Sequence, residues 1–263
     1  MKNSTLLELV RKQKPVVHHL TNWVTIYDCA NIVKAFSASP VMAHAPEEAA
    51  DMAAIASALV LNIGTLTTDL IEAMKLAGQS ANRKGIPVIL DVCGAGATPF
   101  RDRKSLELLT AIKINIIKGN ASEIARIAGE NVRTKGVDAG QVEKDLLAIA
   151  KQLAGQRNAT VVVTGKEDIV TDGKKAFGVR NGMEIMTRVV GTGCMAASVI
   201  GTFAAVHTDL AEAAAVGLSC YEIAAELAAG KTAGPADFKV RLFDEVFKLS
   251  GQAADDRQRI DPL

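Results

Sequence analysis

The sequence predicts one α/β domain in which helices cover both faces of a central, mostly parallel β-sheet. Three observations support this fold class. Short runs rich in Val, Ile and Leu alternate with longer helical patterns along the chain. Of the 263 residues, 49% are hydrophobic, which is enough for one large core. No linker, low-complexity tract or internal repeat interrupts the chain, so residues 1–263 are expected to form a single domain.

The strand candidates are apolar runs bounded by Gly, Asn, Asp or Thr, as expected of strands that are buried on both faces. They are Pro15–His18, Ala58–Ile63, Pro87–Asp91, Ile114–Lys118 and Thr160–Thr164. The helical candidates between them are Val24–Phe36, Thr67–Lys84, Ala121–Ala128 and Val137–Leu153. This alternation predicts parallel strands that are joined by right-handed crossovers.

The pattern changes in the last third of the chain. Between Ile169 and Arg188, Gly173 and the pair Asn181-Gly182 separate short runs and predict antiparallel hairpins. Helices are then expected over Cys194–His207, Leu210–Ala229 and Pro235–Leu249. The tail, residues 253–263, is charged and ends near a proline, so we expect it to fray.

Charge and aromatic content disfavour several classes of function. Lys and Arg number 30 against 29 Asp and Glu, so the formal net charge is +1 and no basic excess is present to hold nucleic acid. Aromatic residues make up only 4%, which argues against base-stacking surfaces. The N-terminus lacks an apolar signal core, and the apolar helical stretches are too short or carry glutamates, so no membrane span is expected. Four scattered cysteines without a CxxC pair favour a reducing, cytoplasmic location over a disulfide scaffold or a zinc site.

The strongest motif for chemistry is Gly191-Thr192-Gly193, which leads into an apolar helix. The free N–H groups of a first helical turn point at an anion, and glycine lets that anion approach the backbone. A transferring phosphoryl group would therefore fit, although an ordinary tight turn before a core helix explains the spacing equally well. Cys194 stands where the helix would begin, and the helix dipole lowers the pKa of a thiol there. It could act as a base, line the pocket, or be a buried small hydrophobe.

Polar residues that end the predicted strands are the next candidates, because open α/β sheets bind ligands beyond the carboxyl ends of their strands. Asp91 precedes Gly94 and Gly96 and could accept a metal-bound water beside an anion loop, but a plain connecting loop is equally compatible. Thr164 could bind a phosphate or a ribose, although Thr-Gly is common in turns. Asn22 is a plausible amide contact for a heterocycle.

The segment Lys118–Glu123 has both a structural and a functional interpretation. Asn120 is a good N-cap and Glu123 stands at the capping-box distance, which is a sufficient structural explanation. In the functional interpretation Lys118 reaches a phosphate and Glu123 holds Mg²⁺, directly or through water. Neither a Rossmann fingerprint nor a Walker A sequence is present, which disfavours an NAD-dependent dehydrogenase.

Taken together and in this order, seven segments resemble the hydroxyethylthiazole kinase family, a branch of the ribokinase-like superfamily. Each segment is weak alone, but the match extends from about His18 to the last long helix. The segments are His19–Asn22, Ala38–Met42, Ala58–Leu66, Pro87–Asp91 with Gly94–Thr98, Lys118–Ile124, Lys135–Asp138 and Gly191–Cys194.

The resemblance implies an ATP- and Mg²⁺-dependent phosphorylation of the hydroxyl of 4-methyl-5-(2-hydroxyethyl)thiazole in thiamine biosynthesis and salvage. It also implies a homotrimer with active sites at the subunit interfaces. The implied roles are assigned by position in this sequence. The thiazole would be contacted by Met42, Gly191 and Asn22, and ATP would be contacted by Lys118, Thr164 and Asn120. Mg²⁺ would be organised by Asp91 and Glu123. The phosphoryl group would be held by the backbone of Gly191, Thr192 and Gly193, and Cys194 would lie at the reacting hydroxyl.

The sequence departs from the family pattern at two places. Lys118 stands where the family often has arginine, so the charge is kept but the bidentate fork is lost. Val92-Cys93 stands where the family usually has Pro-Val, which removes a rigid residue from the loop. Wider ribokinase-like kinases place an aspartate base where Cys194 stands, whereas cysteine is typical of the thiazole branch. The alternatives are another ribokinase-like kinase, acting on a pyrimidine, pyridoxal or a sugar, and a homologue that binds thiazole or nucleotide without turnover.

Overall fold

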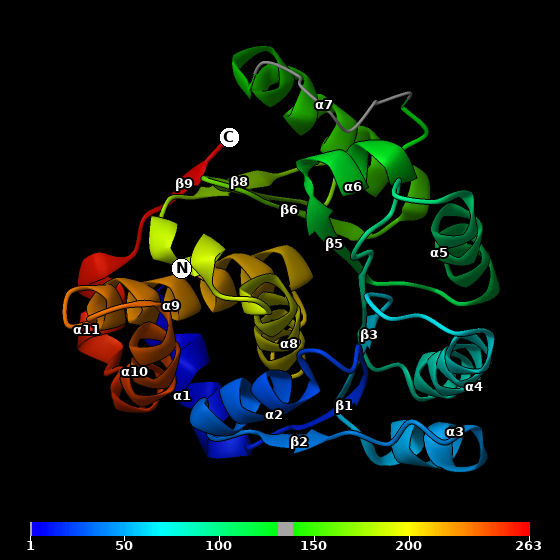
Figure 1. Cartoon of the computed structure of the whole chain (residues 1–263), viewed down its shortest axis with the longest axis horizontal. Helices are drawn as coiled ribbons and strands as arrows, with labels where there is room; N and C mark the ends of the chain where they lie inside the picture. The colour runs from blue at the N-terminus through cyan, green and yellow to red at the C-terminus, as the bar shows by residue number, and fades with distance from the viewer. Residues whose placement is uncertain (1, 131–138) are drawn as a thin grey trace.

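The computed structural model describes residues 2–130 and 139–263, and within them nine strands form one continuous sheet (Figure 1). The strand order is β2-β1-β3-β4-β5-β6-β7-β8-β9. The pairs from β2 to β6 are parallel, and β7, β8 and β9 add antiparallel strands at one edge. The predicted α/β class with a central, mostly parallel sheet is confirmed.

All five predicted strands are present, with ends shifted by at most two residues, and four further strands were not predicted as separate elements. The strands are Val16–Leu20 (β1), Ser39–Val41 (β2), Ala58–Asn62 (β3), Val88–Asp91 (β4), Ile116–Asn120 (β5), Thr160–Thr164 (β6), Asp168–Thr171 (β7), Ala176–Val179 (β8) and Ile260–Pro262 (β9). The hairpin expected around Gly173 is the antiparallel pair β7–β8.

The described helices include every one expected from the sequence, plus four that were not. They are Asn3–Gln13 (α1), Ile26–Ala35 (α2), Pro46–Ile55 (α3), Thr68–Lys84 (α4), Pro99–Ala111 (α5), Ala121–Ile127 (α6), Ala139–Arg157 (α7), Thr192–Ala204 (α8), Leu210–Ala229 (α9), Pro235–Lys248 (α10) and Gly251–Arg257 (α11). The first residues of the expected helix Val137–Leu153, and the segment Lys135–Asp138, lie outside the described residues. No described helix combines the length and the apolar character needed to cross a membrane.

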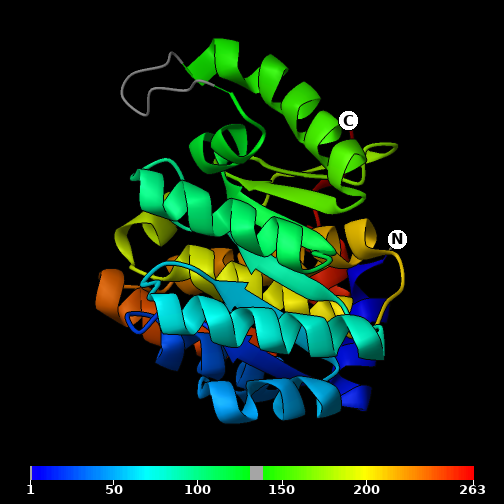
Figure 2. The same ribbon diagram turned by 90° about the vertical axis from the view of Figure 1, so that its right-hand side faces the viewer.

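Helices cover the sheet on both faces. Helices α3, α4 and α5 lie side by side on one face, with α6 and α7 continuing the layer (Figures 1 and 2). The opposite face carries α8 and α9, with α1, α2, α10 and α11 packed around them. Residues of β1, β3, β4, β5 and β6 therefore enter two separate apolar cores, as expected of strands buried on both sides.

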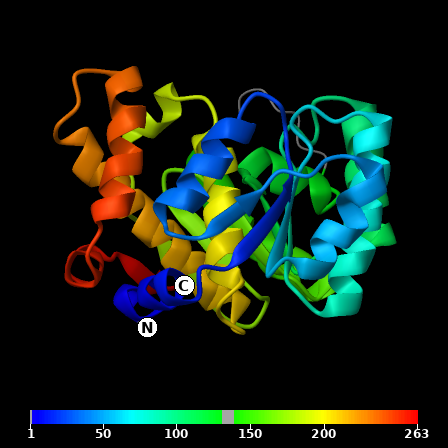
Figure 3. The ribbon, with the colours of Figure 1, turned by 90° about the horizontal axis from the view of Figure 1, so that it is seen from below.

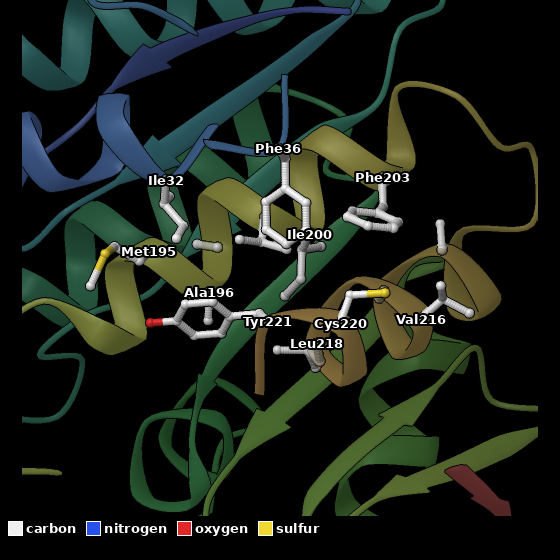
Figure 4. Packing of buried hydrophobic residues seen from close by; sticks show 14 of the residues in the cluster. Ile32, Phe36, Met195, Ala196, Ile200, Phe203, Val216, Leu218, Cys220 and Tyr221 are labelled. Atoms are coloured by element: carbon white, nitrogen blue, oxygen red, sulfur yellow. The ribbon is translucent and has the colours of Figure 1, made fainter. Parts of the chain in front are cut away.

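Helix α8 packs directly on the middle of the sheet because Gly201 has no side chain. A Cβ at this position would lie 2.5 Å from Cγ2 of Val60 in β3. On the other side of α8, the rings of Phe36 and Phe203 meet edge to face with their centroids 5.4 Å apart, and Tyr221 of α9 lies along the helix (Figure 4). This packing fixes where the amino end of α8 meets the strand ends.

The structure contradicts the expectation of a second hairpin near Asn181-Gly182. Gly182 has φ +106°, its N–H donates to Oε1 of Glu226 at 2.9 Å, and Asn181 donates to the same carboxylate. The chain is thereby tied to α9 and turns into a short 3₁₀ helix, Glu184–Arg188. Long-range hydrogen bonds to α9 thus replace the strand pairing that the local turn signal predicts.

The expectation of a frayed tail is also wrong. Ser250 caps α11, Ala254 is buried, and Asp255 accepts hydrogen bonds from the backbone and the hydroxyl of Ser4. Strand β9 then pairs with β8. The two ends of the chain lie at the same end of the molecule (Figure 3), and their mutual contacts order a segment whose own sequence is polar.

Candidate active site

Three polar side chains lie in register at the carboxyl ends of neighbouring strands. Asn62 of β3 pairs with Asp91 of β4, and Asp91 pairs with Lys118 of β5. Two residues earlier in each strand, the apolar side chains enter the core beneath α8. Because side chains alternate along a strand, the three polar groups face the same helix. Thr164 ends β6 on this face, two residues beyond the partner of Lys118.

Asn22 connects this row to α8. Its Nδ2 donates to Oδ1 of Asn62 at 3.0 Å and to Sγ of Cys194 at 3.3 Å. Its Oδ1 accepts hydrogen bonds from the backbone N–H and the hydroxyl of Thr25. Asn62 in turn donates to Oδ2 of Asp91 at 2.7 Å. Since both ends of the Asn22 amide have protein partners, the geometry favours a role in positioning Cys194 and Asn62 over a direct contact with a heterocycle.

Asp91 and Lys118 form a buried ion pair. Nζ of Lys118 lies 3.4 Å from both carboxylate oxygens of Asp91, and the two side chains are 6% and 1% exposed. Burial raises the pKa of Asp91 to about 7, against the opposing charge of Lys118. Burial alone would lower the pKa of Lys118, but the negative charges of Asp91 and Glu123 hold the pKa of this ammonium above its ordinary value. The Lys118 ammonium at the floor of the site therefore stays charged.

The amino end of α8 lies directly over this ammonium. A Cβ on Gly193 would lie 3.3 Å from Nζ of Lys118, and Gly193 itself is exposed. The N–H groups of Thr192, Gly193 and Cys194 find no acceptor among the residues that the structure describes. Helix start and lysine thus present donors and positive charge to the same open space, which suits an anion.

The turn before α8 requires glycine. Gly191 has φ +97°, and a Cβ there would lie 2.6 Å from Cγ2 of Thr25. The hydroxyl of Thr192 points away from the opening and donates to the carbonyls of Met186 and Val189. Behind it, the hydroxyl of Tyr221 donates to the Thr192 carbonyl at 3.2 Å (Figure 4). Thr192 therefore offers a ligand only its backbone N–H.

The thiol of Cys194 has an unusually low pKa. The largest lowering of the pKa of Cys194 comes from a hydrogen bond with the Cys93 thiol. Burial opposes it, but Thr25, the charge of Lys118 and the Asn22 amide lower the pKa further, to about 5. The same contact, together with burial, raises the pKa of Cys93. At neutral pH Cys194 is accordingly a thiolate and Cys93 a thiol.

Glu123 is held by two backbone amides. Its Oε1 accepts from the N–H of Gly94 and its Oε2 from the N–H of Asn120, both at 2.7 Å. Asn120 accepts from the N–H of Glu123 and completes the capping box expected from the sequence. The carboxylate thereby joins the loop after β4 to the start of α6, at the edge of the site.

The acidic residues fit Mg²⁺ only as part of its shell. Asp91 and Glu123 keep lone pairs beyond their present hydrogen bonds, but no described group of three His, Cys, Asp or Glu side chains could hold a metal ion. Mg²⁺ commonly takes one or two carboxylates and completes its shell with water and phosphate oxygens. The two carboxylates therefore suit an ion that arrives with a polyphosphate.

The remaining residues predicted from the sequence lie at the two ends of the row. Thr164 is half-buried and its hydroxyl donates to the Gly119 carbonyl at 3.4 Å. Met42 directly follows β2, beside the end of β1, and is half-buried. Around the opening, four large apolar side chains are mostly exposed: Trp23 (55%), Val24 (67%), Tyr27 (76%) and Val190 (73%).

Three residues of the site were not predicted from the sequence. Asn62 stands near the end of a predicted strand, so the strand-end rule that selects Asp91 would also have found it. Cys93 lies in the loop after Asp91 but carries no sequence signal for its contact with Cys194. Thr25 touches Gly191 only through the packing of α2 beside α8, which no local pattern reports.

Comparisons with known proteins agree with this geometry. The model of the hydroxyethylthiazole kinase family matches residues 7–252. Hydroxyethylthiazole kinase of Methanosarcina mazei is 54% identical over 263 residues, all of both chains, and that of Moorella thermoacetica is 49% identical over 243 residues, 92% of this chain and 91% of the relative. The solved hydroxyethylthiazole kinase structure from Pyrococcus horikoshii superposes with a TM-score of 0.91 at 38% identity, covering 99% of this chain and 98% of that one. A ribokinase-like superfamily protein of Enterococcus faecalis shares the fold alone, with a TM-score of 0.63 at 14% identity over 93% and 95% of the two chains.

Proposed function

The chain belongs to the hydroxyethylthiazole kinase family, and we propose that the site at the start of α8 transfers a phosphoryl group from ATP to the hydroxyl of 4-methyl-5-(2-hydroxyethyl)thiazole. The observation that carries the proposal is the open amino end of α8 directly above the buried ammonium of Lys118. The reaction would serve thiamine biosynthesis and salvage. Four free cysteines suit a cytoplasmic location, where thiols stay reduced.

The residues divide between the two substrates along the row of strand ends. ATP lies towards Lys118, Asn120 and Thr164, and the thiazole lies towards Met42 and Gly191, with its hydroxyl at Cys194. The N–H groups of the first turn of α8 hold the phosphoryl group as charge spreads over its oxygens. Because this transition state is loose, the protein contributes mostly position and charge.

Cys194 orients the hydroxyl and receives its proton. As a thiolate held by Asn22, Cys194 accepts a hydrogen bond from the substrate hydroxyl. This hydrogen bond turns a lone pair of the hydroxyl oxygen towards the phosphorus atom. Its low pKa makes it a weak base, so proton transfer follows rather than drives the attack. Asp91 and Glu123 are the residues that would hold Mg²⁺. When bound, Mg²⁺ neutralises charge on the phosphate oxygens.

We also propose that the active unit is a homotrimer in which a second copy covers the opening. The four exposed apolar residues at the opening support this, because monomeric proteins seldom leave such a patch bare. They come from the turn between β1 and α2, which carries Asn22, from the first turn of α2, and from the turn before α8, which carries Gly191. Light scattering on the purified protein measures the oligomeric state, and a monomer that retains full activity would contradict the proposal.

A coupled ADP-release assay tests the function. We expect ADP release that requires both the thiazole alcohol and Mg²⁺, with little ADP when either is left out. The same assay is run with a hydroxymethylpyrimidine, pyridoxal and a sugar. Release with one of those acceptors but not with the thiazole would reassign the kinase, and binding of both substrates without ADP release would indicate a non-catalytic homologue.

A further inference from the structure

Two buried carboxyl groups meet behind the nucleotide end of the site. Asp168 is the first residue of β7 and Glu222 lies in the middle of α9, and they are only 4% and 7% exposed. The two carboxyl groups lie within hydrogen-bonding reach of each other. Oδ1 of Asp168 also accepts the N–H of Gly165 at 2.9 Å, and Gly165 directly follows Thr164. The pair therefore supports the turn that carries Thr164.

This contact requires a proton between the two groups. Ionised carboxylates only accept hydrogen bonds, so two of them cannot bond to each other. Oε2 of Glu222 is buried and has no donor partner among the described residues. An oxygen in that position is satisfied when it carries the proton and donates it. In contrast, Asp168 accepts an amide N–H, which stabilises its charged form.

The surrounding charges assign the proton to Glu222. Burial first, and then the negative charges of Asp168 and Glu226, raise the pKa of Glu222 well above its usual range, while Arg259 acts against them. Burial also raises the pKa of Asp168, but Gly165 and Lys118 both oppose that rise. The titratable and charged groups that face the pair in the described chain are Lys118 of β5, Tyr221 and Glu226 of α9, and Arg259 ahead of β9.

We propose that Glu222 is a neutral carboxylic acid that donates its proton to Asp168, and that this acid–carboxylate pair positions the Thr164–Gly165 turn for ATP. The proposal rests on the proposed contact between Thr164 and ATP. Both carboxyl groups are buried, so we assign them as positioning residues that act through the turn. The turn at Gly182 packs against Glu222, since a Cβ there would lie 3.5 Å from Cδ of Glu222.

A pH dependence of ATP binding follows from the shared proton. While the proton is present, Asp168 holds the Gly165 amide in place. When the proton is lost at alkaline pH, two like charges are in contact in a buried space, and their repulsion displaces Asp168 from the Gly165 N–H that it accepts. A Glu222→Gln variant keeps a donor to Asp168 at every pH, because its amide does not titrate.

The first test measures kcat and KM for ATP from about pH 8 to about pH 10, a range that lies above the pKa of Asp91, which is about 7, and above the ordinary pKa of a carboxyl group. We expect the wild-type KM for ATP to rise roughly fivefold or more towards alkaline pH, while Glu222→Gln keeps a nearly constant KM. Glu222→Ala leaves Asp168 without a donor, so its KM is expected to be high throughout. A KM that rises equally in wild type and Glu222→Gln would overturn the positioning role.

Glu212→Gln is the matched control. It makes the same substitution in the same helix, but Glu212 lies in the first turn of α9 and pairs with His207. This variant is expected to follow the wild-type profile, because Glu212 lies ten residues before Glu222 in the helix. A flat profile in Glu212→Gln as well would mean that the effect comes from general changes in charge and not from the shared proton.

The second test does not depend on kinase activity. Carboxyl-¹³C-labelled glutamate in the wild-type protein is expected to give one resonance that stays in the neutral position at pH 7 and disappears in Glu222→Gln. If every glutamate resonance in the wild-type protein has the position of an ionised carboxylate at pH 7, the assignment of the proton to Glu222 is disproved, whether or not the variant folds. If the neutral resonance is present but the protein phosphorylates no alcohol, the proposed function fails and the proton assignment stands.

Discussion

Replacement of Lys118 by methionine would show how strongly the buried ion pair holds the site together. The substitution keeps most of the side-chain volume and removes the ammonium that faces Asp91. Breaking a buried pair by removing one partner usually costs about 3–5 kcal/mol, because the other charge is left buried. Asp91 can escape part of this cost by taking up a proton, since burial already raises its pKa to about 7 in the presence of Lys118. The loss of stability in Lys118→Met is therefore expected to depend on pH.

The direction and size of this dependence follow from linkage. In the variant the pKa of Asp91 rises further, so the folded state keeps a proton that the unfolded state, with a pKa of about 3.9, has released. Stability then falls as pH rises, by at most about 1.4 kcal/mol per unit, until the folded pKa is passed. In the wild type the contribution of Asp91 stops changing above about pH 7. The deficit of the variant should thus grow by up to about 2.7 kcal/mol between about pH 7 and about pH 9. Cys194 loses the cation that lowers its pKa, and this change acts in the same direction.

Urea unfolding of both proteins at the two pH values measures this deficit. The double variant Asp91→Asn, Lys118→Met removes the titrating carboxyl and should lose most of the pH dependence. Lys231→Met is the control, because Lys231 is 58% exposed in its pair with Glu245 and its loss should change stability by at most about 0.5 kcal/mol at either pH. A deficit of the same size at both pH values would refute the argument that Asp91 is a buried carboxyl balanced by Lys118.

Three further predictions concern the start of α8 and the metal. Cys194→Ala should slow ADP release without abolishing it and Cys194→Asp should stay active, because orientation matters more than basicity; a Cys194→Asp that folds and binds both substrates without turnover would contradict this role. Gly191→Ala should destabilise the fold by about 1–2 kcal/mol in urea, because of its positive φ and its closeness to Thr25, whereas Gly155→Ala on an open helix surface should be neutral or stabilising. Glu123→Gln should raise the Mg²⁺ concentration needed for half-maximal rate. Its thermal unfolding should stay cooperative, since an amide oxygen can still accept the N–H of Gly94. An unchanged Mg²⁺ titration would argue against Glu123 as a metal-organising residue.

Local patterns in the sequence were sufficient to predict the row of polar residues at the strand ends. Apolar runs buried on both faces identify β1, β3, β4, β5 and β6, and the polar residue that ends each run marks the ligand edge of the sheet. Asp91, Lys118 and Thr164 were found in this way, and the capping box at Asn120 and Glu123 needed only the spacing of two residues. These features depend on neighbours in the chain, which a single sequence reports directly.

The features that were missed depend on contacts between distant segments. The tail is ordered because β9 completes the sheet beside β8, although its own composition is polar. Asn181-Gly182 has a good hairpin signal, but Glu226 of α9 supplies stronger partners. Asp168 and Glu222 come from different elements, and neither carries a local signal that the other exists. Sequence periodicity describes one element at a time and cannot report such pairs.

The charges of the site together explain why the kinase should need a cation with its nucleotide. Close to Lys118 lie the Cys194 thiolate, the Glu123 carboxylate and Asp91, which is near its midpoint at pH 7. Negative groups therefore outnumber the single ammonium, and the dipole of α8 offsets only about half a charge. A polyphosphate that approaches this surface alone meets net repulsion, whereas one that carries Mg²⁺ brings the missing positive charge. As pH rises, the remaining protonated fraction of Asp91 ionises, and the Mg²⁺ concentration required for half-maximal binding of ATP should change. The direction of this change distinguishes two roles for Asp91. A fall indicates that the Asp91 carboxylate helps to hold the ion, and a rise indicates that it only adds repulsion.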